Sequence, residues 1–348
     1  MVKDLVPAAV DANSASADFW RRYHAFRRAR HLETRPDDPL RPDDVVEAAM
    51  RAERRFEIQY RYEIARDGEL LSWFGCSTIK PGAPGYESNR HLMSAGVEVR
   101  ADHRRRGIGR SWLPLVVELM DRHGCTVLGM DAEEESGHAF LKWLGAEARL
   151  WGAESRLQLA EVDWAMVDSW IAEGEARSPQ TRLEIYEDPL PEAMWEEYSA
   201  QLSSLLNTIP FEQLDHGEIV ITPAQMREWY ERMASVGEES HTVIAREADG
   251  LISAMTDVTW AAHTPEVVHQ QFTGVRPEAR GRGIGKWIKA AMLRKVHELH
   301  PEARWITTDN ATSNDPMLKI NHALGFRRHR VGAAYQISRE DLARKISG

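Results

Sequence analysis

The sequence predicts an α+β protein made of two tandem domains, each a mixed, mainly antiparallel sheet flanked by helices. The first observation behind this prediction is length, since 348 residues suit about two domains of ~150 residues each. The second is a repeated stretch, because residues 96–110 and residues 270–286 each show a strand, a glycine loop and the start of a helix. The third is the order of the other elements, in which strand hairpins lie between helices.

Landmarks around the repeated stretch also recur at nearly constant spacing, which indicates a duplication. Three glycine pairs, one each in a hairpin turn, the loop and a helix stop, lie 182, 176 and 180 positions apart: Gly68 and Gly250, Gly107 and Gly283, and Gly145 and Gly325. We therefore expect a first domain at 1–163, a linker helix and loop at 164–180, and a second domain at 181–348.

The first half begins with two expected helices. Phe19, Tyr23 and Phe26 recur on one face of a helix over 18–30, which the proline-rich segment 36–42 separates from a second helix over 43–54. Asp67-Gly68 then turns a strand over 55–65 into a strand over 70–79. The remaining elements of this half are strands at 92–99, 125–131 and 156–162, and helices at 111–122, 137–144 and 164–173.

The second half repeats the plan. Thr222-Pro223 is a typical helix start, with a capping residue followed by proline, and Asp249-Gly250 turns a second hairpin. The expected strands are 182–187, 242–246, 251–259, 267–275, 305–308 and 334–338. The expected helices are 192–206, 222–233, 286–297 and 317–324.

The glycine loops are suited to bind an anion. Without a Cβ, Gly281 and Gly283 allow positive φ and a close approach to a ligand. The helix that follows presents its first N–H groups and the positive end of its dipole, so a phosphate or pyrophosphate fits there. Lys286-Trp287 does not match the Lys-Ser or Lys-Thr of a nucleotide-binding P-loop, and the glycine spacing does not match the dinucleotide fingerprint.

The spacing matches another signature. Arg104-x-x-Gly107-x-Gly109 and Arg280-x-x-Gly283-x-Gly285, each after a strand, resemble the acetyl-CoA signature of the GCN5-related N-acetyltransferases, the GNAT family. The resemblance covers most of the chain as two tandem domains, and the plan is similar to that of the tandem-domain acetyltransferases of the mycothiol synthase type. The stretch 307–326, which ends in Leu324-Gly325-Phe326, adds to it.

The resemblance implies that acetyl-CoA enters a gap where the strand before each loop and the strand after its helix splay apart. It assigns cofactor contacts in the first copy to Val97, Val99, Arg104, Arg105, Arg106, Gly107, Ile108, Gly109 and Arg110. In the second copy it assigns them to Thr273, Val275, Arg280, Gly281, Arg282, Gly283, Ile284, Gly285 and Lys286, and to Asn310 and Asn314 beyond the helix.

The resemblance also points to catalytic residues. A base commonly lies further back on the strand before the loop, where counting by twos from Val275 places Thr273, Gln271 and His269 on one face. Glu98 is the alternative in the first copy, unless it forms an ion pair with an arginine. Asn321 holds the position where many family members have a tyrosine acid, so protonation of the leaving thiolate by a side chain is in doubt there. The acidic run 133–135 of the first copy favours the second domain as the catalyst.

The charge and the amino-acid composition limit the classes of molecule that the protein is expected to bind. A net charge of −10 argues against non-specific nucleic-acid binding and fits a cationic acceptor. Cys76 and Cys125 are the only cysteines and form no C-x-x-C pattern, so we expect no metal site and no disulfide framework. With no apolar run that would span a membrane, we expect a cytoplasmic protein without a membrane partner, as a monomer or homodimer.

The predicted function is acetyl-CoA-dependent N-acetyl transfer to the primary amine of a small molecule, with acetyl-CoA as the cofactor. Acceptors compatible with the sequence include an amino sugar, an aminoglycoside-like antibiotic, a polyamine and a cysteinyl pseudodisaccharide. Two alternatives stay open at this point: a non-catalytic acyl-CoA-binding sensor or scaffold, and a protein N-acetyltransferase.

Overall fold

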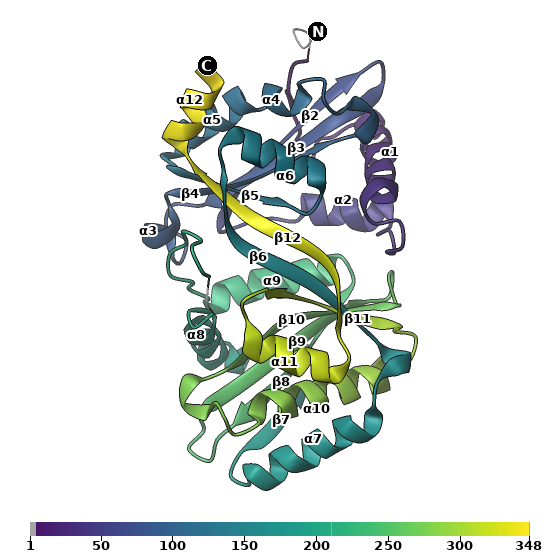
Figure 1. Ribbon diagram of the computed structural model, residues 1–348, viewed down its shortest axis with the longest axis vertical. Helices are drawn as coiled ribbons and strands as arrows, with labels where there is room; N and C mark the ends of the chain where they lie inside the picture. The colour runs from purple at the N-terminus through teal and green to yellow at the C-terminus, as the bar shows by residue number, and fades with distance from the viewer. Residues whose placement is uncertain (1–4, 210, 348) are drawn as a thin grey trace. The chain divides into compact units, whose positions relative to one another are not determined.

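The computed structural model describes residues 5–209 and 211–347, and these residues form two compact units. Unit 1 comprises residues 1–150, 212–218 and 332–348, and unit 2 comprises residues 151–211 and 219–331. Both units are mixed α+β layers, as predicted (Figure 1). Among the described helices, none has the length and apolar character needed to cross a membrane.

Unit 1 has a sheet with the strand order β1-β2-β3-β4-β5-β12. Its strands are β1 (Ala8–Ala9), β2 (Glu57–Arg66), β3 (Glu69–Ile79), β4 (Leu92–Val99), β5 (Val127–Ala132) and the last part of β12 (Arg327–Ser338). Its helices are α1 (Ala17–Thr34), α2 (Asp43–Arg51), α3 (Tyr86–Asn89), α4 (Ile108–Ser111), α5 (Leu113–His123), α6 (Glu135–Leu144) and α12 (Arg339–Ser347).

Neighbouring residues of β3 show how the layers of unit 1 form. Successive side chains of a strand point to opposite faces. Trp73 therefore packs with Phe19 and Trp20 of α1, while Phe74 stacks on the buried Trp112, which lies between α4 and α5, at a centroid distance of 5.2 Å. Pro114 cannot donate a backbone hydrogen bond, so the helix expected over 111–122 is divided into α4 and α5.

Unit 2 has a sheet with the strand order β6-β11-β10-β9-β8-β7. Its strands are most of β6 (Glu147–Gln158), β7 (Arg182–Tyr186), β8 (Glu238–Arg246), β9 (Ile252–Ala261), β10 (Val267–Val275) and β11 (Trp305–Ala311). Its helices are α7 (Trp164–Arg177), α8 (Trp195–Leu206), α9 (Pro223–Ser235), α10 (Ile284–Leu299) and α11 (Asp315–Leu324). Thr222 caps α9 with a reciprocal capping box, which confirms the expected helix start.

The two faces of the unit 2 sheet carry separate cores. On one face, α7 and α10 pack over Val258, Val268 and Ile306. On the other face, α8 and α9 pack over Ile244 and Met255. The face covered by α8 and α9 and the face covered by α10 are therefore distinct environments for any side chain on β9 or β10.

The sheet of each unit is completed by one strand and one helix that lie at one end of that unit's sequence. In unit 2, β6 pairs with β11 through residues 152–158, and α7 then places Val167 and Trp170 in the core beside α10. In unit 1, β12 pairs with β5 through residues 333–338, and α12 then buries Leu342 beside α5.

The division into units differs from the expected domain boundaries in four segments, which are residues 151–163, 164–180, 212–218 and 332–348. Residues 164–177, expected as a linker helix, are part of the unit 2 core. Gly174 allows this packing, since a Cβ there would lie 2.3 Å from the Trp287 ring. Residues 332–348, expected in the second domain, belong to unit 1. Residues 212–218 also join unit 1, where Asp215 exchanges two 2.7 Å hydrogen bonds with the side chain of Gln336.

The assignment of α12 to unit 1 and of α7 to unit 2 gives a stability prediction. Replacing the fully buried Leu342 with alanine removes core contacts of unit 1, and we expect a loss of about 2–5 kcal/mol in the unfolding free energy of that unit. Hydrogen exchange of α5 and β5 peptides should accelerate, with smaller changes in α10. Val167→Ala is the corresponding variant of unit 2, where Val167 is fully buried, and it should accelerate hydrogen exchange in that unit instead. Faster exchange in α10 than in α5 after Leu342→Ala would contradict the assignment of residue 342 to unit 1.

Candidate acetyltransferase site

Two parallel strands separate in each unit, as the sequence led us to expect. In unit 2, β10 pairs with β11 from Val267–Trp305 to Gln270–Thr308, yet both strands continue beyond that point. In unit 1, β4 and β5 pair only over residues 92–94 and 127–129. A gap thus opens between parallel strands beside the glycine loop of each unit. We call these gaps the β10–β11 splay and the β4–β5 splay.

Only the unit 2 strand has a β-bulge at the splay. Gln270 pairs with Val258, whereas Thr273 pairs with Thr256, so Gln271 and Phe272 together oppose Asp257. In unit 1, β3 and β4 pair without such a shift over residues 72–77 and 94–99. A bulge leaves a backbone group without its ladder partner and re-aims side chains, which is why bulges are common next to active sites.

The bulge changes which side chains share a face, and the alternation expected for β10 is wrong on this point. Gln271 donates to Thr259 Oγ1 at 2.9 Å, and His269 pairs with Thr259 in the ladder. Thr273 instead hydrogen-bonds Thr256, at 2.8 Å between the two hydroxyls. His269 and Gln271 therefore share one face, and Thr273 lies on the other. Simple counting by twos cannot find this, because the extra residue resets the period.

His269 and Gln271 lie on the face that α8 and α9 cover. Asp257 is on the same face of β9, two residues from Thr259, and is only 4% exposed. Its carboxyl group accepts the Phe272 backbone N–H that the bulge releases. Burial raises the pKa of Asp257 to about 7, although that hydrogen bond acts to lower it.

Two tyrosines lie around this aspartate from the helices above. Burial, followed by the nearby Asp257 carboxylate, raises the pKa of Tyr198 well above its ordinary value. Burial raises the pKa of Tyr230 to about 12. Both tyrosines pack in the core of α8 and α9 together with Phe272. The face therefore holds a protonatable carboxyl group among neutral phenols.

The opposite face holds a buried amine. Lys289 of α10 is 3% exposed, and its ammonium lies 3.4 Å from Gln270 Oε1. Burial lowers the pKa of Lys289 to about 7. Gln270 in turn donates to Thr256 Oγ1 and to the Asp257 carbonyl. Sequence reasoning missed both Asp257 and Lys289, since each is a single charged residue within an apolar segment that has no motif.

The two glycine loops have the geometry expected of an anion cradle. Gly107 and Gly283 cap the following helices with nearly identical torsions, φ 83°, ψ 0° and φ 84°, ψ 1°. Gly281 has φ 79°, and Arg105 holds the corresponding place in unit 1 with φ 60°. Such a φ is costly for a residue with a Cβ, so the unit 1 loop carries backbone strain that the unit 2 loop avoids.

The last glycine of each loop allows close packing of helices. A Cβ on Gly109 would lie 3.3 Å from the Phe140 ring, and one on Gly285 would lie 3.4 Å from Ile320 and Val275. Ile108 and Ile284, between the glycines, are buried. The loops are thus held against α6 and α11, with the first turn of the next helix facing the splay.

The arginines of the signature have structural partners. Arg104 Nε donates to the Val99 carbonyl at 3.1 Å, and Arg280 Nε donates to the Val275 carbonyl at 3.2 Å. Each therefore fastens its loop to the end of the preceding strand. Arg282, expected at the pyrophosphate, instead pairs with Glu247 at 2.8 Å.

Other basic residues of the loops lie at the surface. Arg105, Arg106, Arg110 and Lys286 are exposed. Arg110 lies over Trp143, at 5.9 Å from the ring centre, and Lys286 lies over Trp170, at 4.8 Å. Val97 pairs with Phe74 along the edge of the β4–β5 splay.

In unit 1, charged side chains of the protein span the β4–β5 splay. Arg30 of α1 is only 9% exposed and binds Glu134, Glu33 and, at 3.4 Å, Glu98. Glu98 lies at the end of β4 and Glu134 follows β5, so this guanidinium joins the two strands that separate. Glu98 therefore takes part in an ion pair with an arginine, which is the alternative to a catalytic role that the sequence analysis offered.

The same network occupies donors of the unit 1 loop. Glu33 accepts the Ala101 backbone N–H at 3.0 Å and contacts Arg104 at 3.2 Å. Glu134 contacts Arg104 at 2.9 Å. Burial would raise the pKa of Glu134, but the hydrogen bond from Arg30 holds it below its ordinary value. Carboxylates of the protein thus already bind Arg104 and the Ala101 N–H, two of the groups that would attract a phosphate.

In unit 2, neutral residues take the places of these carboxylates. Gly274 corresponds to Glu98, since each precedes the Val-Arg that ends its strand. A Cβ at Gly274 would lie 2.4 Å from the Phe272 ring, so the bulge leaves no space for an acid there. Asn314 holds the N-cap position of α11, as Glu134 does at α6, and the Asn314 side chain accepts the Met317 N–H. The β10–β11 splay therefore lacks the charges that oppose an anion in unit 1.

Two asparagines lie together at the far edge of this splay. Asn321 of α11 is 1% exposed and donates to Asn310 Oδ1 of β11 at 2.7 Å. The Asn321 side-chain oxygen is buried and has no hydrogen-bond partner among the described residues. Asn321 thus orients Asn310 and keeps one acceptor open, but it cannot serve as an acid.

Comparisons with known proteins agree with this geometry. Residues 13–146 match the family model of the acetyltransferase (GNAT) family. A comparison with curated protein sequences finds no significant match.

Several solved structures resemble the chain, and three of them are described as GNAT proteins or N-acetyltransferases. A tandem GNAT protein from the clavulanic acid biosynthesis pathway shares 20% identity at a TM-score of 0.73, covering 97% of this chain and 99% of its own. A GCN5-related N-acetyltransferase from Sphaerobacter thermophilus shares 14% identity at a TM-score of 0.63, covering 96% of both chains. A glucosamine N-acetyltransferase region in a fungal multi-domain GH3 β-N-acetylglucosaminidase shares 11% identity at a TM-score of 0.66, covering 96% of this chain and 38% of that one. At these identities the likeness concerns the fold.

The chain is thus built as two GNAT-like units, each with a signature loop at the mouth of a strand splay. Residues 13–146 match the GNAT family model and the whole chain has the fold of a tandem GNAT protein, which together support an acyltransferase of that type. The family generally uses acetyl-CoA and acts on amine acceptors.

The buried Asp257 gives a pH-dependent prediction. Its pKa is raised from 3.8 to about 7 in the folded state. Its contribution to stability is therefore complete below pH 3.8 and is lost as the pH rises through 7. Asp257→Asn keeps an acceptor for the Phe272 N–H and should stabilise the chain by about 2–4 kcal/mol at pH 8. The gain should nearly vanish at pH 4 in urea unfolding. The exposed Asp249→Asn is the control, and an equal gain at both pH values would contradict the buried, protonated carboxyl.

Proposed function

We propose that the chain is an acetyl-CoA-dependent N-acetyltransferase that acts on the primary amine of a small molecule, with transfer in unit 2. One observation carries the choice of unit: the bulged β10–β11 splay carries Gly274 and Asn314 where the β4–β5 splay carries Glu98 and Glu134, both bound by Arg30. The carboxylates of unit 1 would repel a negatively charged cofactor, whereas the neutral residues at the same places in unit 2 would not.

The unit 2 loop fits a pyrophosphate. The first intrahelical bonds of α10 are donated by Lys286 and Trp287 to the Gly283 carbonyl, so the amides of Ile284 and Gly285 precede the ladder and can donate to an anion. A Cβ on Gly281 would meet nothing within 4 Å, which shows open space beside the backbone. Exposed Arg280 and Lys286 add positive charge.

The splay fits the rest of acetyl-CoA. Strands β10 and β11 stop pairing after Gln270 and Thr308, so the backbone groups of β10 that face β11 beyond this point and have no partner within the protein are available to a pantetheine arm. Asn310 and Asn314 lie on the opposite edge. When bound there, acetyl-CoA would supply a thioester carbonyl for attack by an amine.

Side chains of this protein would then remove a proton from the acceptor amine and position that amine. His269 is exposed on the α8 and α9 face, where Thr307 lies 3.0 Å from its Nδ1. Near neutral pH an imidazole can take a proton from the ammonium form of the acceptor, which leaves the neutral amine to attack the thioester. Gln271, on the same face, can hold the acceptor through its amide. Asn321 is no acid, so the thiolate would be protonated by solvent or by the proton that the amine releases.

The acceptor class follows from the same face. Asp257, Tyr198 and Tyr230 make its buried wall polar without a fixed cation, which suits an ammonium or a polyhydroxylated amine. The net charge of −10 attracts a cationic acceptor at long range. An amino sugar is one member of this class, and the fungal region of similar fold is described as acting on glucosamine.

The loop assignment can be tested with a matched pair of variants. Aspartate tolerates the left-handed backbone better than most residues, so Gly283→Asp and Gly107→Asp should both fold. We expect Gly283→Asp to weaken CoA binding by about 100-fold or more, because a carboxylate would meet the pyrophosphate. Gly107→Asp should change it by less than about threefold.

Isothermal calorimetry with CoA should accordingly give one site per chain. Two sites, of which Gly107→Asp removes one, would show that the ion network of unit 1 opens for the cofactor. Binding of CoA without thiol release across a panel of amines would support an acyl-CoA sensor in place of an enzyme.

The base can be tested separately. His269→Ala should lower kcat by about 10²–10⁴-fold at pH 7 while CoA affinity stays unchanged. The lost rate should return partly at high pH, where more of the amine is unprotonated. Gln271→Ala should raise KM for the acceptor with a smaller effect on kcat. A His269→Ala enzyme with kcat within about threefold of the parent at pH 7 would rule out this residue as the base.

A further inference from the structure

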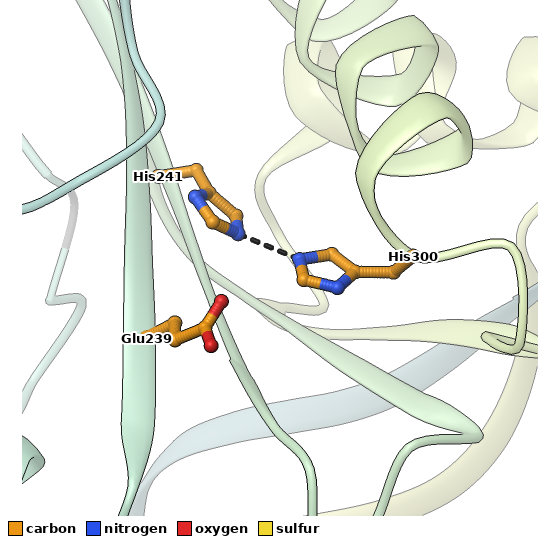
Figure 2. Close-up of side chains that lie close together, drawn as sticks. All are labelled: Glu239, His241 and His300. Carbon is orange, nitrogen blue, oxygen red and sulfur yellow. Dashed lines mark hydrogen bonds between the residues drawn. The ribbon is translucent and has the colours of Figure 1, made fainter.

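Three side chains with metal-binding groups meet in unit 2 at the end of α10 that lies away from the glycine loop. Glu239 and His241 lie two residues apart on β8, so they share one face of that strand. His300 directly follows the last residue of α10. Figure 2 shows the two imidazoles edge to edge, with the carboxylate of Glu239 directed toward them.

The three groups are close enough to share one ion. His241 Nε2 and His300 Nε2 lie 2.7 Å apart, and one ligand atom from each of the three residues lies within 4.8 Å of the others. His241 is 2% exposed and His300 is 4% exposed, while Glu239 is exposed. The cluster is therefore buried on its imidazole side and open to water on its carboxylate side.

Surrounding groups hold the imidazoles in place. His241 Nδ1–H donates to the Glu187 carbonyl at 2.5 Å. This bond fixes the tautomer in which Nε2 carries the lone pair, as in metal-ligating histidines whose other nitrogen donates to a carbonyl. The His300 ring stacks on Trp260 with centroids 4.1 Å apart. Without a metal, the His300 Nε2–H donates to His241 Nε2.

We propose that Glu239, His241 and His300 form a binding site for a divalent transition ion of the zinc class, with water as the fourth ligand. Two imidazoles and one carboxylate are a donor set that zinc accepts in tetrahedral sites. Zn–N distances of about 2.0–2.1 Å require the two Nε2 atoms to lie about 3.4 Å apart. The rings thus need to separate by roughly 0.7 Å. The proton on His300 Nε2 moves to His300 Nδ1 when the ion takes its place.

The position of the site defines its role. Helix α10 has 16 residues, so its two ends lie about 24 Å apart at 1.5 Å per residue. The ion therefore does not reach the glycine loop or take part in acetyl transfer. It ties the beginning of β8 to the end of α10, and so stabilises the strand order on which the α8 and α9 face is built.

The test uses the full chain and zinc chloride alone. Calorimetry of the parent protein should give one zinc ion per chain with a Kd in the micromolar range or tighter. Glu239→Gln should weaken binding by about tenfold or more, because it removes a charged oxygen ligand at an exposed position. Glu238→Gln is the matched control, since Glu238 is the adjacent residue of β8 and points to the other face, and it should leave the affinity unchanged.

His300→Phe is the second test. It keeps the ring that stacks on Trp260 but removes the nitrogen ligand, so zinc binding at this site should be lost. In the parent protein, Co²⁺ should give the visible absorption bands of a tetrahedral ion, and these bands should disappear in His300→Phe. If that variant fails to fold, Glu239→Gln still decides the matter, because its side chain is exposed.

The proposal is overturned if the parent chain binds no zinc in this range. It is also overturned if Glu239→Gln and Glu238→Gln bind zinc equally, which is the result expected if other histidines of the chain bind the ion. CoA binding and acetyl transfer measured on the same variants keep the two proposals apart. Loss of zinc binding with transfer intact is the expected pattern. Absent transfer in a zinc-binding chain would count against the proposed function alone.

Discussion

The organisation of unit 2 depends on one break in backbone pairing. Buried N–H and C=O groups must find partners, so a strand inside a sheet can leave its neighbour only where other groups replace the lost bonds. Here the bulge at Gln271 and Phe272 releases an N–H, and the buried Asp257 carboxyl accepts it. Burial of that carboxyl is unfavourable, as its raised pKa shows. The gain is a strand whose end turns away from β11 and whose side chains His269 and Gln271 face α8 and α9.

The two units show how one duplicated motif can reach different states. Their loops have nearly the same torsions at Gly107 and Gly283, because the helix start requires them. Their surroundings differ in charge. In unit 1, Arg30 joins Glu98 to Glu134 across the splay, while Gly274 and Asn314 leave the corresponding space in unit 2 neutral. The family model matches residues 13–146, which lie in the first unit.

The exchange of terminal elements makes each unit depend on both parts of the sequence. A sheet edge that loses its last strand exposes unpaired backbone and apolar surface. Unit 2 covers this edge with β6 and α7, and unit 1 covers it with β12 and α12. The buried Val167 and Leu342 are the corresponding anchors. A cut near residue 163 would therefore remove β12 and α12 from unit 1 and β6 from unit 2.

The sequence by itself determined the fold class, the duplication, both glycine loops and most hairpins and helix starts, because these follow from local rules: periodicity, glycine torsions and capping residues such as Thr222. Tertiary structure decided the rest. The bulge in β10 reset the alternation of His269 and Thr273. Arg282 and Glu98 have partners that lie far away in the chain. In the proposed zinc site, His300 is likewise distant in the chain from Glu239 and His241. The sequence also did not show that β6 completes the sheet of unit 2 and β12 that of unit 1, because strand pairing between distant segments leaves no local pattern. Local chemistry fixed what each segment forms, and long-range packing fixed which charges meet at the splays.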